Sequence, residues 1–343
     1  MSTKPTYSIQ FLILFIGLLA CFILNISLGS VHISFPETLK VVFGHELEQE
    51  PSFYIIWNYR FPKAITALLV GAGLSLSGLL MQTLFRNPLA GPFVLGISSG
   101  ASLGAAFLIM GSSLFSGFFT FSIFNDVALA VASSLGSLLV LIVVMTVAAR
   151  IKDTMALLII GLMFGSITAA IVSVLSYFSN AEKLQQYIYW SFGSLGNLSW
   201  NQVVILCLFT IAGIFLSILS IKSLNALLLG ENYAQSLGIR LKTARYTVIV
   251  ATGLLAGCIT AFAGPIAFVG LAVPHITRQL FRTTEHRIQI PAVLCCGGIL
   301  MLLCDTIAQI PGSVSVLPIN AITSIFGAPV VIWLLLRRKR MVF

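Results

Sequence analysis

The stretch RFPKAITALLVGAGLSLSGLLMQTLFRNPLAGPFVLGISSGASLG, residues 60–104, contains the signals that decide the fold. Its first half holds an apolar run long enough to cross a bilayer, which takes about 20 residues. Residues 87–92, NPLAGP, then interrupt the run with Pro and Gly before a second apolar run begins. Gly96, Gly100 and Gly104 recur every four residues, which gives a helix a smooth face against a neighbour. We therefore predict two membrane helices joined by an irregular turn, with the glycines at a helix contact.

The composition of the whole chain extends this prediction. Of its 343 residues, 58% are hydrophobic and 8% are charged, and the mean hydropathy is +1.04. Soluble domains carry roughly 25% charged residues, and a soluble chain this apolar would expose more hydrophobic surface than water tolerates. The net charge of +9 is not gathered on a soluble module, so it indicates orientation in a membrane and not nucleic-acid binding. We expect one all-α integral membrane domain, residues 1–343.

Apolar runs predict ten membrane spans, with nine as the alternative count. Their approximate bounds are 8–28, 64–85, 93–112, 127–149, 154–178, 200–220, 246–263, 265–277, 288–308 and 319–336. The second interruption, AGPIAFVG at residues 263–270, divides two of them. Interrupted spans leave backbone groups that must face protein or a water-filled cavity, and paired interruptions point to a transport pathway.

The Lys and Arg residues predict the orientation of these spans. If the N-terminus is cytoplasmic, only Lys40, Arg60, Lys63 and Lys183 of the 19 fall outside. This bias predicts a multi-pass protein of the inner (cytoplasmic) membrane with both termini in the cytoplasm. The external segments are then 29–63 and 179–200, and the longest internal one is 222–245.

No signature of an enzyme is present in the sequence. It lacks the phosphate-binding GxxxxGK[ST] loop, the GxSxG elbow and HExxH. The cysteines have no metal-ligand spacing, the histidines are scattered, and no polar cluster suits a membrane enzyme. We therefore predict no catalytic residue, metal ligand or cofactor in this chain. No Asp, Glu, Lys, Arg or His lies near the middle of a predicted span, which argues against an ion-coupled secondary transporter, kept as a distant alternative.

Residues 222–245, KSLNALLLGENYAQSLGIRLKTAR, form the longest polar segment on the predicted inner side. They read as two short helices, 224–229 and 231–237, each ended by a glycine, Gly230 and Gly238, because glycine accepts the left-handed conformation at helix ends. Composition leaves two interpretations open: a surface that docks a cytoplasmic protein, or a loop that lies on lipid headgroups.

Four stretches together carry a family resemblance. Residues 60–104, YWSFGSLGNLSW (189–200), GPIAFVGLAVPHITR (264–278) and LPINAITSIFGAPVVIWLLL (317–336) closely resemble the permeases of binding-protein-dependent ABC importers. The subfamily is the FecCD type, which takes up iron–siderophore complexes, haem and cobalamin. The resemblance implies a ten-helix, type II importer permease for an iron chelate, a ferric siderophore or haem. Cobalamin is the alternative cargo, and an oxyanion is a more distant one.

The same resemblance implies partners. Permeases of this family pair as dimers, for which we prefer a homodimer over a heterodimer. Each copy docks one ATPase, so that ATP and Mg are bound by two separate ATPase subunits. A periplasmic or lipid-anchored binding protein delivers the substrate. The segment 222–245 resembles the coupling element, with Gly230, Glu231, Ala234, Leu237 and Gly238 matching the motif that fits the ATPase. The resemblance thus favours docking over a lipid-bound loop.

The family also implies a pathway, lined by the fifth and tenth helices, that opens alternately to each side. Carried over to this chain, the gate is the turn Asp153-Thr154, followed further in by Gly161, Phe164 and Ser166.

Arg60 and Lys63, at the predicted outer mouth, are expected to grip acidic residues of the binding protein. Snorkelling to lipid phosphate is the alternative. Gln309 departs from the pattern, because the best-known cobalamin permease carries a third basic residue at the matching position, which weakens the cobalamin assignment slightly.

Overall fold

The computed structural model describes residues 7–29, 31, 33–42, 50–111, 126–151, 154–309 and 315–336. Every regular element within these ranges is helical. In the described part of the chain, seven helices are long and apolar enough to cross a membrane. They are α1 (Ser8–Ser27), the continuous Pro51–Leu84 that ends in α4 (Phe61–Leu84), α6 (Asp126–Arg150), α7 (Thr154–Tyr177), α9 (Trp200–Leu219), the continuous Leu241–Ala263 formed by α12 (Leu241–Thr252) and α13 (Cys258–Ala263), and α15 (His286–Ala308).

Three shorter helices occupy the remaining predicted spans. They are α5 (Ile97–Met110), α14 (Val269–Phe281) and α16 (Ile319–Leu336). The all-α membrane fold with about ten crossings is thereby confirmed, with bounds close to those predicted. Among the described residues, four further short helices lie outside the predicted spans: α2 (Phe35–Val42), α8 (Ala181–Ser191), α10 (Ile221–Leu228) and α11 (Glu231–Ser236). The short helix α3 (Glu50–Ile55) leads into the continuous helix Pro51–Leu84.

The centre of the bundle is α4, which packs against α15, α14, α9 and α12. Glycines let the backbones meet: a Cβ on Gly71 would collide with the carbonyl of Gly297 in α15, and one on Gly78 with that of Gly270 in α14. The glycine face predicted for α5 is also confirmed, because Gly100 and Gly104 pack against the backbone of α6. Close backbone contacts at glycines thus join α4 to α15 and α14, and α5 to α6.

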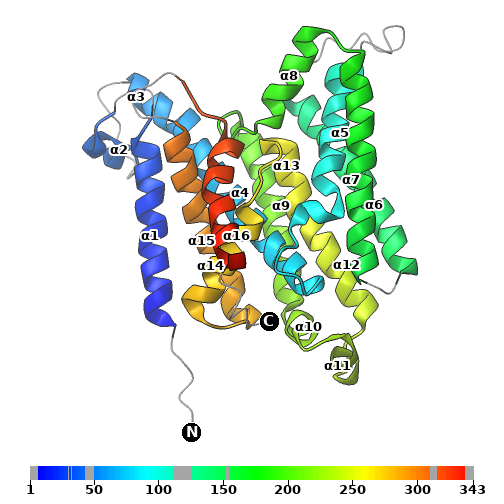
Figure 1. Cartoon of the computed structure of the whole chain (residues 1–343). Coiled ribbons are helices and arrows are strands. Elements are labelled where there is room, and N and C mark those ends of the chain that lie inside the picture. The colour runs from blue at the N-terminus through cyan, green and yellow to red at the C-terminus, as the bar shows by residue number, and fades with distance from the viewer. Residues whose placement is uncertain are drawn as a thin grey trace.

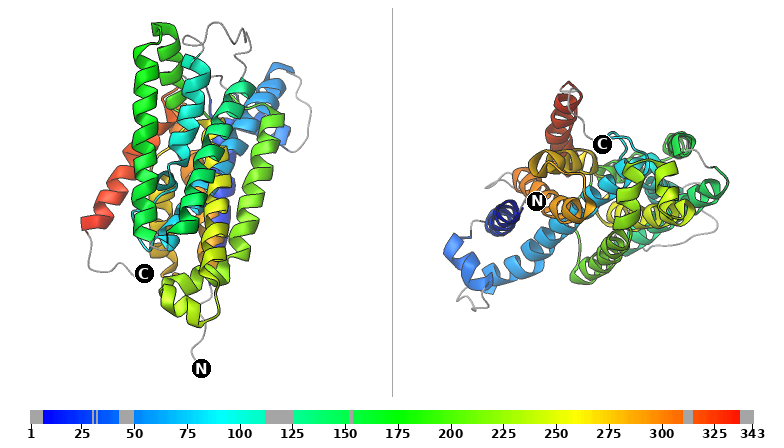
Figure 2. Two further views of the ribbon diagram at one scale, coloured as in Figure 1. Left: turned by 90° about the vertical axis from the view of Figure 1, so that its right-hand side faces the viewer. Right: turned by 90° about the horizontal axis from the view of Figure 1, so that it is seen from below.

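The two ends of the bundle differ. The short helices α2, α3 and α8 lie at one end, here called the α8 end, and the α10–α11 hairpin lies at the other, the hairpin end (Figure 1). In both views of Figure 2, α16 leans away from the bundle, and it packs mainly on α14 and α15.

The two Pro/Gly interruptions meet in space. Pro92 and Phe93 from one, and residues 265–268 from the other, line a cavity of about 140 Å³ with Asn320 of α16. Backbone groups freed by the breaks find partners within the protein. The Ala267 N–H donates to Asn320 Oδ1 (3.1 Å), and the Pro88 carbonyl is 2.8 Å from His275 Nε2. The expectation that such groups face protein or a cavity is confirmed.

Candidate functional site

The predicted two-helix hairpin is present as α10 and α11. Gly230 (φ +108°) and Gly238 (φ +81°) hold left-handed backbone conformations after each helix. At the second turn, the N–H of Gly238 donates to the carbonyl of Gln235, and the N–H of Ile239 donates to that of Ala234. This pair of bonds is the Schellman ending of a helix, which favours glycine at the left-handed position. The turn sharply reverses the chain into α12.

The five residues predicted for ATPase coupling lie together on the hairpin but do different things. Ala234 is fully buried, whereas Leu237 is exposed. Glu231 forms an ion pair with Arg245 of α12 (2.6 Å), which ties α11 to the bundle. Only Leu237 of the five therefore presents an apolar side chain outward, and it is accompanied by the exposed ring of Tyr233.

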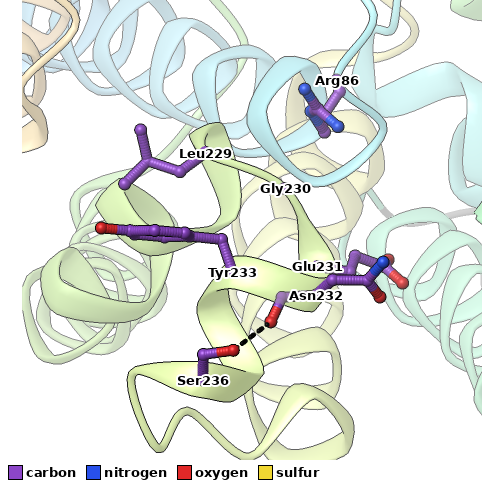
Figure 3. Close-up of a pocket in the computed structure, with 7 residues that line it drawn as sticks. All are labelled: Arg86, Leu229, Gly230, Glu231, Asn232, Tyr233 and Ser236. Atoms are coloured by element: carbon purple, nitrogen blue, oxygen red, sulfur yellow. Dashed lines mark hydrogen bonds between the residues drawn. The ribbon is translucent and has the colours of Figure 1, made fainter.

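A hollow of about 600 Å³ opens between the hairpin and the end of α4. Figure 3 shows its lining: Arg86, Leu229, Gly230, Glu231, Asn232, Tyr233 and Ser236. The Arg86 side chain projects from the end of α4 above the hairpin. Leu229 and Tyr233 are exposed beside it. The hollow thus combines a cation with apolar and aromatic groups, the composition typical of protein-binding hot spots.

Arg86 was not singled out by the sequence, and its backbone is unusual. Its N–H donates to Thr83 and that of Asn87 to Gln82, so Arg86 occupies the same position at the end of α4 that Gly238 occupies at α11. Its φ of +46° is left-handed, which costs a residue with a side chain about 1–2 kcal/mol. Within the described residues, the Arg86 guanidinium makes no hydrogen bond and no ion pair. The strained backbone therefore carries an exposed, uncompensated cation.

At the α8 end, the structure places Arg60 inside the protein. Its side chain donates to the carbonyls of Ile26 (2.8 Å), Ser27 (2.9 Å) and Val31, and the residue is only 8% exposed. The guanidinium holds the chain where it leaves α1. This geometry is contrary to the expectation that Arg60 offers a free cation to a binding protein.

Lys63 is also engaged, although less deeply. Its Nζ lies 3.2 Å from Oδ1 of Asp305, which is nearly buried. The other carboxylate oxygen of Asp305 accepts from Asn25 (2.9 Å) and from Gln309 (2.8 Å). Gln309, the departure noted in the sequence, thus completes this buried cluster. Arg60 and Lys63 are therefore both paired within the chain.

The predicted pathway residues do not share one surface. Gly161 is buried, and a Cβ there would collide with the carbonyl of Val94. Phe164 is half-buried and Ser166 is exposed. Thr154 begins α7, and Asp153 lies outside the described residues. Close packing explains Gly161, so only the exposed part of α7 stays available as a pathway wall.

Comparisons with known proteins agree with this architecture. The model of the FecCD transport family matches residues 17–337. A vitamin B12 import system permease protein of Salmonella typhimurium is 38% identical over 286 residues, 83% of this chain and 84% of that protein. The one of Klebsiella pneumoniae is 39% identical over 285 residues, 83% of each chain.

Two solved structures are similar as well. A structure assigned to an inward-facing metal-chelate type ABC transporter matches with a TM-score of 0.84 at 28% identity, covering 96% of this chain and 100% of that one. PsaBC from Streptococcus pneumoniae, in complex with Fab, matches with a TM-score of 0.55 at 14% identity, covering 86% and 94%, which supports the fold alone.

Proposed function

This chain belongs to the FecCD transport family of ABC importer permeases, and from that premise we propose that it carries an iron chelate, a ferric siderophore or haem, into the cytoplasm. The observation that carries the importer assignment is the family match over residues 17–337. Cobalamin is the second candidate, favoured by the 38% identity to a vitamin B12 import permease. Gln309 bonds Asp305 within the chain, so a third basic docking residue is not available there.

The cargo can be tested directly. Proteoliposomes with the permease, its ATPase and its binding protein would be offered a ferric siderophore, haem and cobalamin in parallel. ATP-dependent uptake of one of the first two supports the primary assignment, and uptake of cobalamin alone supports the second. Uptake that follows an ion gradient without ATP would contradict the importer assignment and support the secondary-transporter alternative.

The hairpin end is the proposed docking face for the ATPase. The sequence has no phosphate-binding loop, so ATP and Mg would be held by two separate ATPase subunits, and the chain itself would carry no cofactor. Exposed Leu237, Tyr233 and Leu229 supply apolar contacts around the hollow. Arg86 supplies a cation for which a carboxylate of the ATPase is the matching group.

The proposed orientation places this face in the cytoplasm of a cell whose inner membrane the protein crosses, with both termini inside. The opposite, α8 end would then meet a periplasmic or lipid-anchored binding protein. Since Arg60 is buried, Lys63 is the remaining candidate of the predicted pair, and it would have to leave Asp305 to reach a partner. A second permease copy completes the assembly, with a homodimer preferred over a heterodimer.

A further inference from the structure

Asn225, in α10, reaches out of the hairpin to the first residue of α15. Its Oδ1 lies 3.0 Å from the backbone nitrogen of His286 and 2.7 Å from Nδ1 of the same residue. Because a backbone N–H can only donate, the atom that receives it is the amide oxygen, and His286 Nδ1 must also carry a proton. The preceding residue, Glu285, makes no side-chain cap. The hairpin therefore supplies the N-terminal cap of a membrane helix.

The other ring nitrogen of His286 faces α4. His286 Nε2 lies 2.9 Å from the Thr83 hydroxyl oxygen. In the neutral ring with its proton on Nδ1, Nε2 is an acceptor, and Thr83 donates to it. The same hydroxyl lies 2.9 Å from the Leu79 carbonyl, so its single proton serves one of the two acceptors at a time. His286 is 1% exposed, which leaves water little access to replace either partner.

The neighbour of Thr83 continues the network into α14. Gln82 donates through Nε2 to the Leu271 carbonyl (3.2 Å) and accepts through Oε1 from Arg278 (2.9 Å). At the end of α4, Thr83 thus bonds α15 and Gln82 bonds α14. Since α14 packs on α16, a continuous set of contacts runs from the hairpin to the helix that leans out of the bundle.

We propose that Asn225, His286 and Thr83 form a polar link that transmits displacement of the hairpin to α15 and α4. This makes them positioning residues of the transport cycle, and the inference rests on the function proposed above. Leu224 and Leu227 of α10 are buried apolar side chains, whose packing is non-directional and tolerates sliding. One oxygen that receives two donors from His286 fixes both distance and direction.

The experiment uses the full complex in proteoliposomes and measures three quantities: ATPase retained on the permease, basal ATP hydrolysis, and substrate imported per ATP hydrolysed. Asn225→Leu and Thr83→Val each remove the link. Asn225→Asp keeps the acceptor oxygen of the link, and Thr83→Ser keeps its hydroxyl. Asn201→Leu makes the same amide-to-leucine change at an exposed position of α9 and serves as the control.

The removing variants are expected to import about fivefold less substrate per ATP, with retention and basal hydrolysis unchanged. The conservative variants and the control should stay within about twofold of the native complex. The double variant Asn225→Leu/Thr83→Val should be no worse than either single one, because one link is broken once. An unchanged import ratio in both removing variants, or loss of ATPase retention instead, would overturn the proposal. A native complex without ATP-driven uptake would instead defeat the proposed function.

Discussion

The two ends of the bundle use their charged residues in opposite ways. At the α8 end, Arg60 donates to three backbone carbonyls and Lys63 pairs with nearly buried Asp305. At the hairpin end, Arg86 stands over an open hollow. Arg60 and Lys63 therefore hold this chain together, whereas Arg86 is left exposed on a strained backbone.

The difference shows that the position of a charge along the sequence does not tell whether the charge is free. Arg60 and Lys63 attract attention because they break the bias of positive charge toward one side. A cation on the minority side can equally be retained because it satisfies buried acceptors, which are costly to leave unpaired. Arg86 follows the bias, so nothing marks it until its backbone and surroundings are seen.

Replacing Arg60 by Met should give the largest effect and would test the structural role at the α8 end. Three carbonyls lose a charged donor, each worth roughly 1.5–3 kcal/mol. We expect the free energy of unfolding to fall by about 5 kcal/mol, near the lower bound for three such bonds, measured by equilibrium unfolding in mixed micelles. Arg240→Met, at an exposed arginine of the hairpin end, should leave stability unchanged. Native stability in Arg60→Met would show that the guanidinium is free after all.

The Lys63–Asp305 pair should show the next largest effect. Lys63→Met leaves a nearly buried carboxylate without its cation, which typically costs about 3 kcal/mol. Asp305→Leu in the same chain removes that charge, so the double variant should recover much of the loss. Unfolding of the native, single and double variants measures the coupling. Additive losses would mean that the ion pair contributes little, and Lys63 would then be available to a binding protein.

Much of the fold was predictable because a bilayer sets helix lengths. The bounds of α7 and α16 nearly match the apolar runs. The site was predictable only where local rules apply. Gly230 and Gly238 were found because left-handed helix endings favour glycine.

Contacts between distant residues could not be predicted in the same way. Arg60 bonds the end of α1, and Lys63 pairs with a residue in α15. Because neither partner is near in the sequence, both cations were interpreted as docking residues for a binding protein. Asn225 and His286 are likewise far apart in the sequence, and nothing in either local pattern indicates a partner. Gly161 was read as a pathway residue although close packing on Val94 accounts for it.

Gly238 tests whether the shape of the hairpin matters apart from its surface. Its φ is +81°, and a Cβ there would meet nothing within 4 Å, so a side chain is opposed by backbone strain alone. Gly238→Val should cost about 2 kcal/mol locally and distort the turn. We expect import per ATP to collapse while membrane insertion and hydrolysis persist. Gly238→Asn should be milder, because Asn tolerates the left-handed region. Normal import in the Val variant would remove the turn from the coupling role.

Arg86→Gly removes the guanidinium and also relieves the backbone strain. These two effects have opposite signs on docking and on stability, so the variant is the sharpest test of the exposed cation. Glycine adopts φ near +46° without penalty, so the fold should become slightly more stable while docking of the ATPase weakens by about 1.4 kcal/mol, or tenfold. Arg282→Gly is the matched control, because Arg282 is also an exposed left-handed arginine (φ +47°) but does not line the hollow. Binding of the ATPase to both variants, measured at several salt concentrations, decides the issue. Equal weakening of ATPase binding in the two variants would show that overall positive charge causes the effect. Weakening confined to Arg86→Gly would place a carboxylate of the ATPase at the hollow.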